Sequence, residues 1–248
     1  ALFSCSASLI LLGVISMALV RPPLRAPSGP RQRTIETLLA GIAYVRREKI
    51  ILGAITLDLF AVFFGGITAL LPIFAKDILK VGPAELGYFR SAAALGAGVA
   101  ALYLARFPLR KNAGKILFYA VAMFGVMTLV FSLSNTLWLS MFALAAMGAS
   151  DMVSVVVRST VTQLAVPPEM RGRVGAVNSV FISASNELGE WESGMTAHWF
   201  GARKAASLGA MVTLGVVAIS AIVFRELRSV DRFEDVRPRP LPEGPPET

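Results

Sequence analysis

The chain has 248 residues, of which 55% are apolar, and it carries a formal net charge of +8 at pH 7. Long apolar stretches and a mean hydropathy of +0.65 exclude an ordinary soluble domain. The single cysteine, Cys5, excludes an intrachain disulfide and a thiolate metal cluster. Because the basic residues flank the apolar stretches and form no single patch, no nucleic acid partner is expected.

Several stretches are long and apolar enough to cross a bilayer, which takes about 20 residues of helix. They are Leu2–Val20, Ile50–Ala75, Leu86–Ala105, Ile116–Leu133, Leu137–Leu164, Val174–Met195 and Ala205–Phe224. The sequence therefore predicts an all-α, multi-pass membrane protein.

The first stretch is separated from the others by a basic, proline-rich linker. We expect four parts: a span in residues 1–20, the linker in 21–49, a bundle of spans in 50–224 and a disordered tail in 225–248. Within the linker, Thr34 is placed to N-cap a short amphipathic helix. This helix either lies on the anionic cytoplasmic leaflet or simply extends the next span.

The basic residues indicate the orientation of the spans. Alternating loops hold most of the arginines and lysines, and the remaining loops hold only Lys76, Lys80, Arg203 and Lys204. Cytoplasmic loops are the basic ones. The pattern predicts an integral plasma (inner) membrane protein with a cytoplasmic C-terminus.

Charged side chains are unevenly distributed among the spans. Asp58, Asp151, Arg158, Glu187 and Glu190 lie within apolar runs, whereas Ile116–Leu133 and Ala205–Phe224 contain no charged residue. A charge in hydrocarbon costs several kcal/mol unless it faces a bundle interior or a wet cavity. Some spans are therefore expected to line a polar path, and the two uncharged ones to face lipid.

Asp151 and Arg158 are seven residues apart and fall on one helix face, with Asp151 at about mid-depth. Asp58 is expected at the depth of Arg158 on an antiparallel helix, so the two are predicted to pair. These residues either take part in transport or form a structural clamp. Arg90, near the outer end of its span, either contacts an anionic substrate or snorkels to headgroups.

The stretch Val174–Met195 is the most polar of the predicted spans. One broad face is expected to hold Asn178, Ser185, Asn186, Gly189 and Glu190. Glu187 is expected at mid-depth, where a carboxylic acid could bind and release a proton. Glu187 could equally serve packing alone. Small residues at spacing four (Gly175, Ser179, Ser183; Ser185, Gly189, Ser193) and the pair Gly96 and Gly98 would permit close helix packing.

Common motifs of enzymes do not occur in the sequence. It has no phosphate-binding loop, no HExxH and no Cys/His ligand set, so no cofactor and no metal are expected and the chain is not expected to be an enzyme. An intramembrane enzyme using Asp151 and Glu187 as paired carboxylates is the weaker alternative.

The block from Gly148 to Gly194 resembles the C-terminal half of major facilitator superfamily exporters. The segments that carry the resemblance are Gly148–Val153, Arg158–Thr160, Pro168–Val174 and Asn178–Glu190, and the closest branch in appearance is the enterobactin-exporter-like, or transmembrane secretion effector, group. The resemblance implies a six-helix C-terminal bundle of a major facilitator fold, one preceding transmembrane helix and a missing N-terminal six-helix half. The loop Phe107–Lys115 departs from the superfamily signature, since it lacks that signature's Asp and paired glycines.

These observations lead to one functional hypothesis and one alternative. The hypothesis is proton-coupled export of a small amphipathic compound, siderophore-like or drug-like, by alternating access in the bilayer together with the missing half. The expected pathway residues are Asp58, Arg90, Asp151, Arg158, Asn178, Asn186, Glu187 and Glu190. The alternative is a truncated, non-transporting membrane module that acts as an interaction partner.

Overall fold

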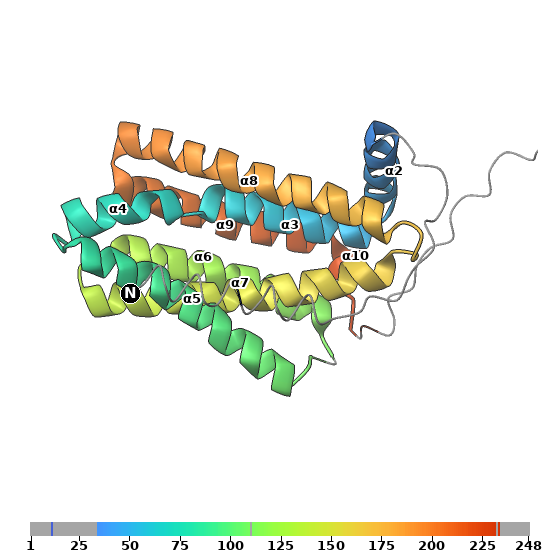
Figure 1. Cartoon of the computed structure of the whole chain (residues 1–248), viewed down its shortest axis with the longest axis horizontal. Helices are drawn as coiled ribbons and strands as arrows, with labels where there is room; N and C mark the ends of the chain where they lie inside the picture. Colours follow the sequence, from blue (N-terminus) through green and yellow to red (C-terminus); the bar gives the residue numbers. More distant parts are fainter. Residues whose placement is uncertain (1–10, 12–33, 110, 232, 234–248) are drawn as a thin grey trace, which may run out of the picture. The chain divides into compact units, whose positions relative to one another are not determined.

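The computed structural model describes residue 11 and residues 34–109, 111–231 and 233 (Figure 1). Apart from residue 11, the predicted span Leu2–Val20 lies outside the described residues, as do the linker before Thr34 and residues 234–248 of the predicted tail. The helices from Thr34 onward belong to one compact unit. Regular structure in the described part of the chain is all helical, as predicted.

Each predicted span from Ile50 onward corresponds to a helix. The long helices are α3 (Lys49–Gly65), α5 (Pro83–Arg106), α6 (Ala113–Leu133), α7 (Leu137–Ala165), α8 (Arg171–Phe200) and α9 (Ala202–Val223). Within the described part of the chain, five segments are long and apolar enough to cross a membrane, namely Lys49–Ile78, α5, α6, α7 and α9. α8 does not reach this apolarity although it is 30 residues long, because it carries three glutamates and many small polar residues.

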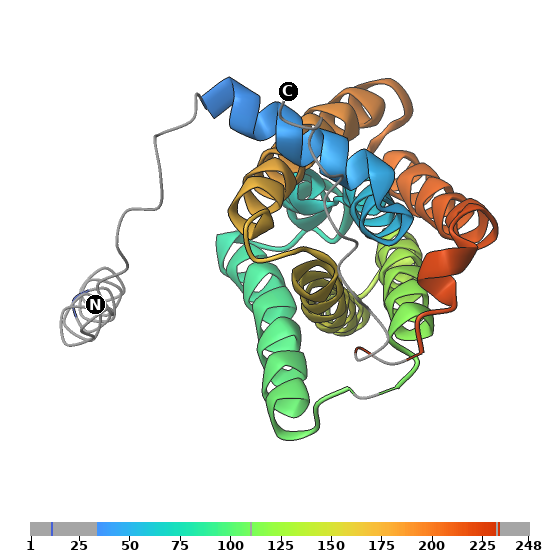
Figure 2. The same cartoon turned by 90° about the vertical axis from the view of Figure 1, so that its right-hand side faces the viewer.

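The long helices form two layers (Figures 1 and 2). α3, α8 and α9 make up one layer, and α5, α6 and α7 the other. Contacts between α6 and α9 join the layers on one side. A groove lies between α7 and α8 at the ends where the chain passes from one helix to the other.

The span that begins with α3 is interrupted at Gly65 and Gly66. α3 ends at Gly65, and the chain continues through η1 (Thr68–Leu70), α4 (Leu71–Ile73) and η2 (Phe74–Ile78). Gly65 lies so close to α6 and α9 that a Cβ atom there would be 2.7 Å from the Phe124 ring and 2.9 Å from the Thr213 hydroxyl. The helix thus breaks where its neighbours pack closely against it. The apolarity of the sequence alone does not reveal this break.

α5 and α7 pack closely through small residues. A Cβ atom on Gly96 would overlap the carbonyl oxygen of Ala145, and one on Gly148 would overlap that of Ala93. Such contacts let two helix backbones approach in a membrane, where packing rather than hydrophobic burial holds helices together. Gly98, by contrast, has no neighbouring atom within 4 Å of the corresponding position.

We expect Gly96→Ala to destabilise the protein by about 1–3 kcal/mol, the usual cost of overpacking, because the obstacle is backbone that cannot rotate away. Gly98→Ala, two residues away on the same helix, is the matched control. It should be neutral or slightly stabilising, since alanine favours helix over glycine. Thermal unfolding of the two variants in detergent measures the difference, and equal midpoints would contradict this packing.

The amphipathic helix predicted in the linker is present as α2 (Thr34–Arg47). Glu48 has extended backbone angles (φ −92°, ψ 96°), so α2 is separate from α3 and does not extend it. Its described side chains contact protein: Val45 is buried, and the Tyr44 hydroxyl donates a hydrogen bond to the Ala165 carbonyl oxygen at 3.0 Å. Leu39 remains exposed. One side of α2 is thus held against the bundle.

The prediction of a disordered tail from Arg225 is wrong for its first residues. α10 (Arg225–Arg228) continues the chain after α9, and Leu227 is fully buried in the core. Lys49 and Glu226 form an ion pair at 3.2 Å. The composition of this segment suggested disorder because its charged residues outnumber its apolar ones. The few apolar residues nevertheless include Leu227, which is buried in the core.

The same segment caps the start of α6. The first N–H groups of a helix lack partners within the helix. Here the N–H groups of Asn112, Ala113 and Gly114 donate to Asp231 and Val230, at 3.0 to 3.2 Å. This C-terminal segment therefore fixes the loop between α5 and α6 at one end of the bundle.

The two spans without internal charges present large apolar side chains to the outside. Tyr119 and Met123 on α6, and Ile219 and Ile222 on α9, are exposed in the isolated bundle. Such surfaces are suited to contact acyl chains. Leu95, Val99 and Leu102 of α5 are exposed as well, so the expectation that α6 and α9 in particular face lipid stays a prediction.

Candidate functional site

A buried ion pair joins α3 to α7. The Arg158 guanidinium donates through Nη1 to Oδ2 of Asp58, and both side chains are more than nine-tenths buried. The sequence predicted this pair from the depths of the two residues on antiparallel helices. Removing two charges from water is costly, so their mutual attraction is what allows them to be buried.

Asp151 lies about two turns of α7 away from Arg158. Together with Asp58 and Ser154 it lines a small cavity between α3, α6 and α7, which the rings and methyl groups of Ala61, Val62, Val121 and Phe124 complete. The cavity volume is about 10 Å³, roughly what one water molecule needs. Two carboxyl groups and a hydroxyl therefore line a cavity with space for a single water.

Three polar atoms around this region have no hydrogen-bond partner among the described residues. They are Oγ of Ser154, Nε of Arg158 and Oδ1 of Asn178, all inaccessible to solvent. A buried polar atom without a partner costs about 1–3 kcal/mol, so native proteins usually satisfy such atoms with water or a ligand. These atoms mark a polar interior with unused hydrogen-bonding capacity.

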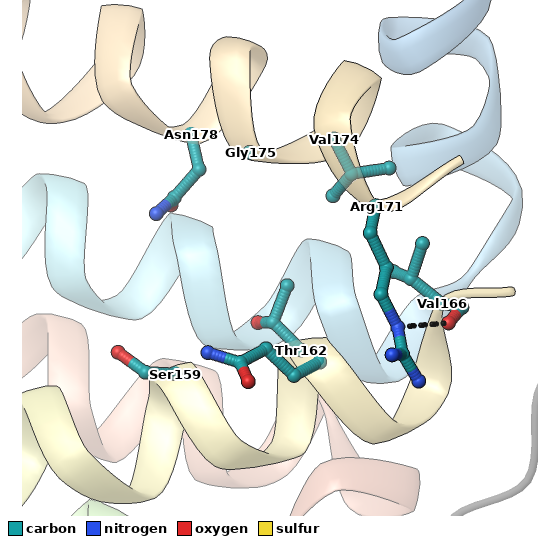
Figure 3. A pocket seen from close by; sticks show the side chains of 8 residues that line it. Ser159, Thr162, Val166, Arg171, Val174, Gly175 and Asn178 are labelled. Carbon is teal, nitrogen blue, oxygen red and sulfur yellow. Dashed lines mark hydrogen bonds between the residues drawn. The ribbon is translucent and has the colours of Figure 1, made fainter. Parts of the chain in front are cut away.

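A polar groove lies beside this region, between the connected ends of α7 and α8 (Figure 3). Its volume is about 140 Å³, and it is lined by Ser159, Thr162, Gln163, Val166, Arg171, Val174, Gly175 and Asn178. Asn178 extends from α8 toward α7 across the groove. Arg171 closes the end where the chain passes from α7 to α8, and its Nε donates to the Val166 carbonyl oxygen at 3.3 Å.

α8 packs on α3 through one of its two small-residue stripes. The hydroxyls of Ser185 and Ser193 donate to the carbonyl oxygens of Leu59 and Gly66, at 2.7 and 3.0 Å. Between them, a Cβ atom on Gly189 would approach the backbone of Phe63 to 2.8 Å. The stripe Ser185, Gly189 and Ser193 therefore serves helix packing, as its spacing suggested.

The second stripe, Gly175, Ser179 and Ser183, does not pack on another described helix. All three residues are exposed, and no atom lies within 4 Å of a Cβ position at Gly175. No described helix packs against this stripe, so for these three residues close packing stays a prediction.

Asn186, Glu187 and Glu190 continue the exposed polar face of α8 toward its other end. Asn178 does not share this face: it is half-buried and lines the groove, which corrects the prediction of one common face. Glu187 likewise does not line the cavity that holds Asp151. The structure thus brings Asp58, Asp151 and Arg158 together and places Glu187 and Glu190 on an open surface of α8.

Arg90 lies apart from these groups. It is exposed on α5, near the end of that helix at Pro83, and no ion pair of Arg90 occurs among residues whose placement is described. The choice between contact with an anion and snorkelling stays open.

The sequence did not single out three polar residues of the groove: Ser159, Gln163 and Arg171. Ser159, Thr162 and Gln163 fall within five residues at the end of an otherwise apolar span. That density of polar side chains was the available signal. Arg171 was recognised only as a residue that determines orientation.

Comparison with known proteins agrees with this architecture. The chain matches the family model described as transmembrane secretion effector over residues 2–245. It is 25% identical, over 236 residues, to the enterobactin exporter EntS of Shigella boydii serotype 18 and to that of Escherichia coli O81. The alignments cover 88% of this chain and 51% of the relatives, so the chain spans about half the length of the curated relatives it matches. No solved structure matches. The chain belongs to the transmembrane secretion effector family of the major facilitator superfamily.

Proposed function

We propose that the intact protein is a secondary active exporter of the inner membrane. It moves a small amphipathic compound, siderophore-like or drug-like, by alternating access, and protons drive the cycle. In this proposal the described helices form one of two bundles, and the second bundle faces the groove between α7 and α8. Family membership and the exporter relatives support the class of function, and the half-length match supports the second bundle.

The observation that carries the proposal is the exposed polar face of α8. Ser179, Ser183, Asn186, Glu187 and Glu190 are all exposed on a helix as long as its membrane-spanning neighbours. A row of polar and acidic side chains against hydrocarbon would cost several kcal/mol. It is stable if it faces water or another protein surface, which is what a transport path between two bundles provides.

Within this path we assign roles by position. Asp151 lies in the interior beside Asp58 and Ser154, where a change of its charge would act on the α3–α7 ion pair. Glu187 and Glu190 lie on the open face, where water reaches them and where cargo would pass. Asp151 and Glu187 are accordingly the candidates for proton handling, and the polar groove with Asn178 and Arg171 the candidate contact for cargo.

A transport assay on the intact protein tests the function directly. Cells that express it should accumulate less of at least one compound in a panel of siderophores and amphipathic drugs than cells without it. A protonophore should abolish the difference. Efflux that persists without a proton gradient would remove proton coupling, and no efflux of any compound would favour the non-transporting module.

A further inference from the structure

A second cavity, apolar and larger, lies under α2. Its volume is about 350 Å³, and α2, α3 and α8 enclose it. The lining residues are Ile42, Val45, Arg46, Leu52, Ile55, Thr56, Leu59, Phe60 and Phe181. Only Arg46 and Thr56 among them carry polar side chains, and no acidic residue lines the cavity. It shares no lining residue with the polar groove or with the cavity beside Asp151.

The depth of this cavity matches one leaflet. Arg46 lies at the end of α2, just before the break at Glu48, and Phe60 lies 11 residues into the bundle from Lys49. At 1.5 Å per residue that is roughly 16 Å of helix. Half of the hydrocarbon core is about 15 Å thick. The cavity therefore runs from the membrane surface to about the midplane, which is the reach of an acyl chain from one leaflet.

The charge around the cavity is positive at one end. Arg46, Arg47 and Lys49 are all exposed where α2 meets α3, whereas the acidic residue between them, Glu48, is buried. Lys49 pairs with Glu226, whereas no described ion pair involves the two arginines. Basic pockets between membrane helices on the cytoplasmic side bind anionic headgroups. A cationic mouth above an apolar interior is complementary to a phospholipid that has an anionic headgroup and apolar acyl chains.

We propose that this cavity binds one anionic phospholipid, with an acyl chain against Leu52, Leu59 and Phe181 and the phosphate on Arg46. Exported cargo fits it less well, because cargo must be released into water and the cavity offers only one hydroxyl besides the arginine. The bound lipid would hold α2 against α3 and α8. The proposed lipid site requires that the cavity lies within one leaflet of the membrane. It does not depend on which compound the protein transports.

Native mass spectrometry of the purified intact protein tests this proposal, with phosphatidylglycerol as the probe and phosphatidylcholine of the same chains as the comparison. We expect one saturable site selective for phosphatidylglycerol. Arg46→Gln should weaken it about tenfold, since it removes a charge-assisted hydrogen bond. Thr56→Trp should abolish it by filling the cavity. Arg47→Gln, on the same helix but outside the lining, is the matched control and should bind as the native protein does.

Several outcomes would overturn the assignment. Equal binding of the two lipids would make the cavity a nonselective apolar slot. Loss of binding in Arg47→Gln to the same extent as in Arg46→Gln would place the headgroup elsewhere on a diffuse basic surface. Unchanged binding in both cavity variants, or no bound lipid at all, would exclude the site. Displacement of the lipid by an exported compound would assign the cavity to cargo.

Discussion

Arg158→Gln is expected to lower the free energy of unfolding by about 3–5 kcal/mol, the cost of leaving one member of a buried ion pair unpaired. Asp58 would remain more than nine-tenths buried, facing a cavity with space for roughly one water. Unfolding in detergent by a denaturing surfactant, followed by tryptophan fluorescence, measures the change. Arg171→Gln provides the control, since Arg171 is exposed at the end of α8 and also bonds to a carbonyl oxygen.

The double variant Asp58→Asn/Arg158→Gln separates the ion pair from side-chain volume. Because it leaves no unpaired charge, it should recover most of the stability that Arg158→Gln loses, and it should also abolish transport if the pair changes during the cycle. A double variant as unstable as the sum of the two single variants would show that the pair is no coupled unit.

Asp151→Asn is expected to reduce gradient-driven export at least tenfold while leaving the amount of folded protein unchanged. The amide has nearly the shape of the carboxyl group but cannot gain or lose a proton. Among the described residues Asp151 has no ion pair that the change would break. This expectation rests on the proposed function. Efflux from vesicles with an imposed pH gradient measures it.

Two variants make the Asp151 result specific. Asp77→Asn, on the exposed surface of η2, should export at the native rate, because that residue lies far along the chain from the cavity and does not line it. Asp151→Glu keeps a titratable carboxyl group and should retain part of the activity. If Asp151→Asn exports normally, Asp151 has no part in coupling, and Glu187→Gln becomes the next variant to test.

The helix positions and the α3–α7 pair could be predicted from the sequence because both depend on local quantities. Apolar length gives the spans, and 1.5 Å per residue gives the depth at which Asp58 and Arg158 meet. The break after Gly65 and the burial of Leu227 could not be predicted in this way. Both depend on contacts with residues that are distant in the sequence.

The orientation of α8 shows the same limit. Helical periodicity correctly separates the stripe of Ser185, Gly189 and Ser193 from that of Gly175, Ser179 and Ser183, but it does not say which stripe meets a neighbour. Only the position of α3 decides this, through the carbonyl oxygens of Leu59 and Gly66. For the same reason the grouping of Asn178 with Asn186 was wrong.

Cysteine accessibility tests most directly whether the polar face of α8 borders water. In a Cys5→Ser background, Ser183→Cys and Ala184→Cys place a thiol at nearly the same depth on neighbouring, exposed positions. Ser183 follows the polar row with Ser179 and Asn186, whereas Ala184 lies on the side of Val180, Leu188 and Trp191. A water-soluble, thiol-specific reagent applied to the intact protein in membranes should label Ser183→Cys rapidly and Ala184→Cys slowly. Equal, slow labelling of both would place the polar face against lipid or packed protein and contradict the proposed path.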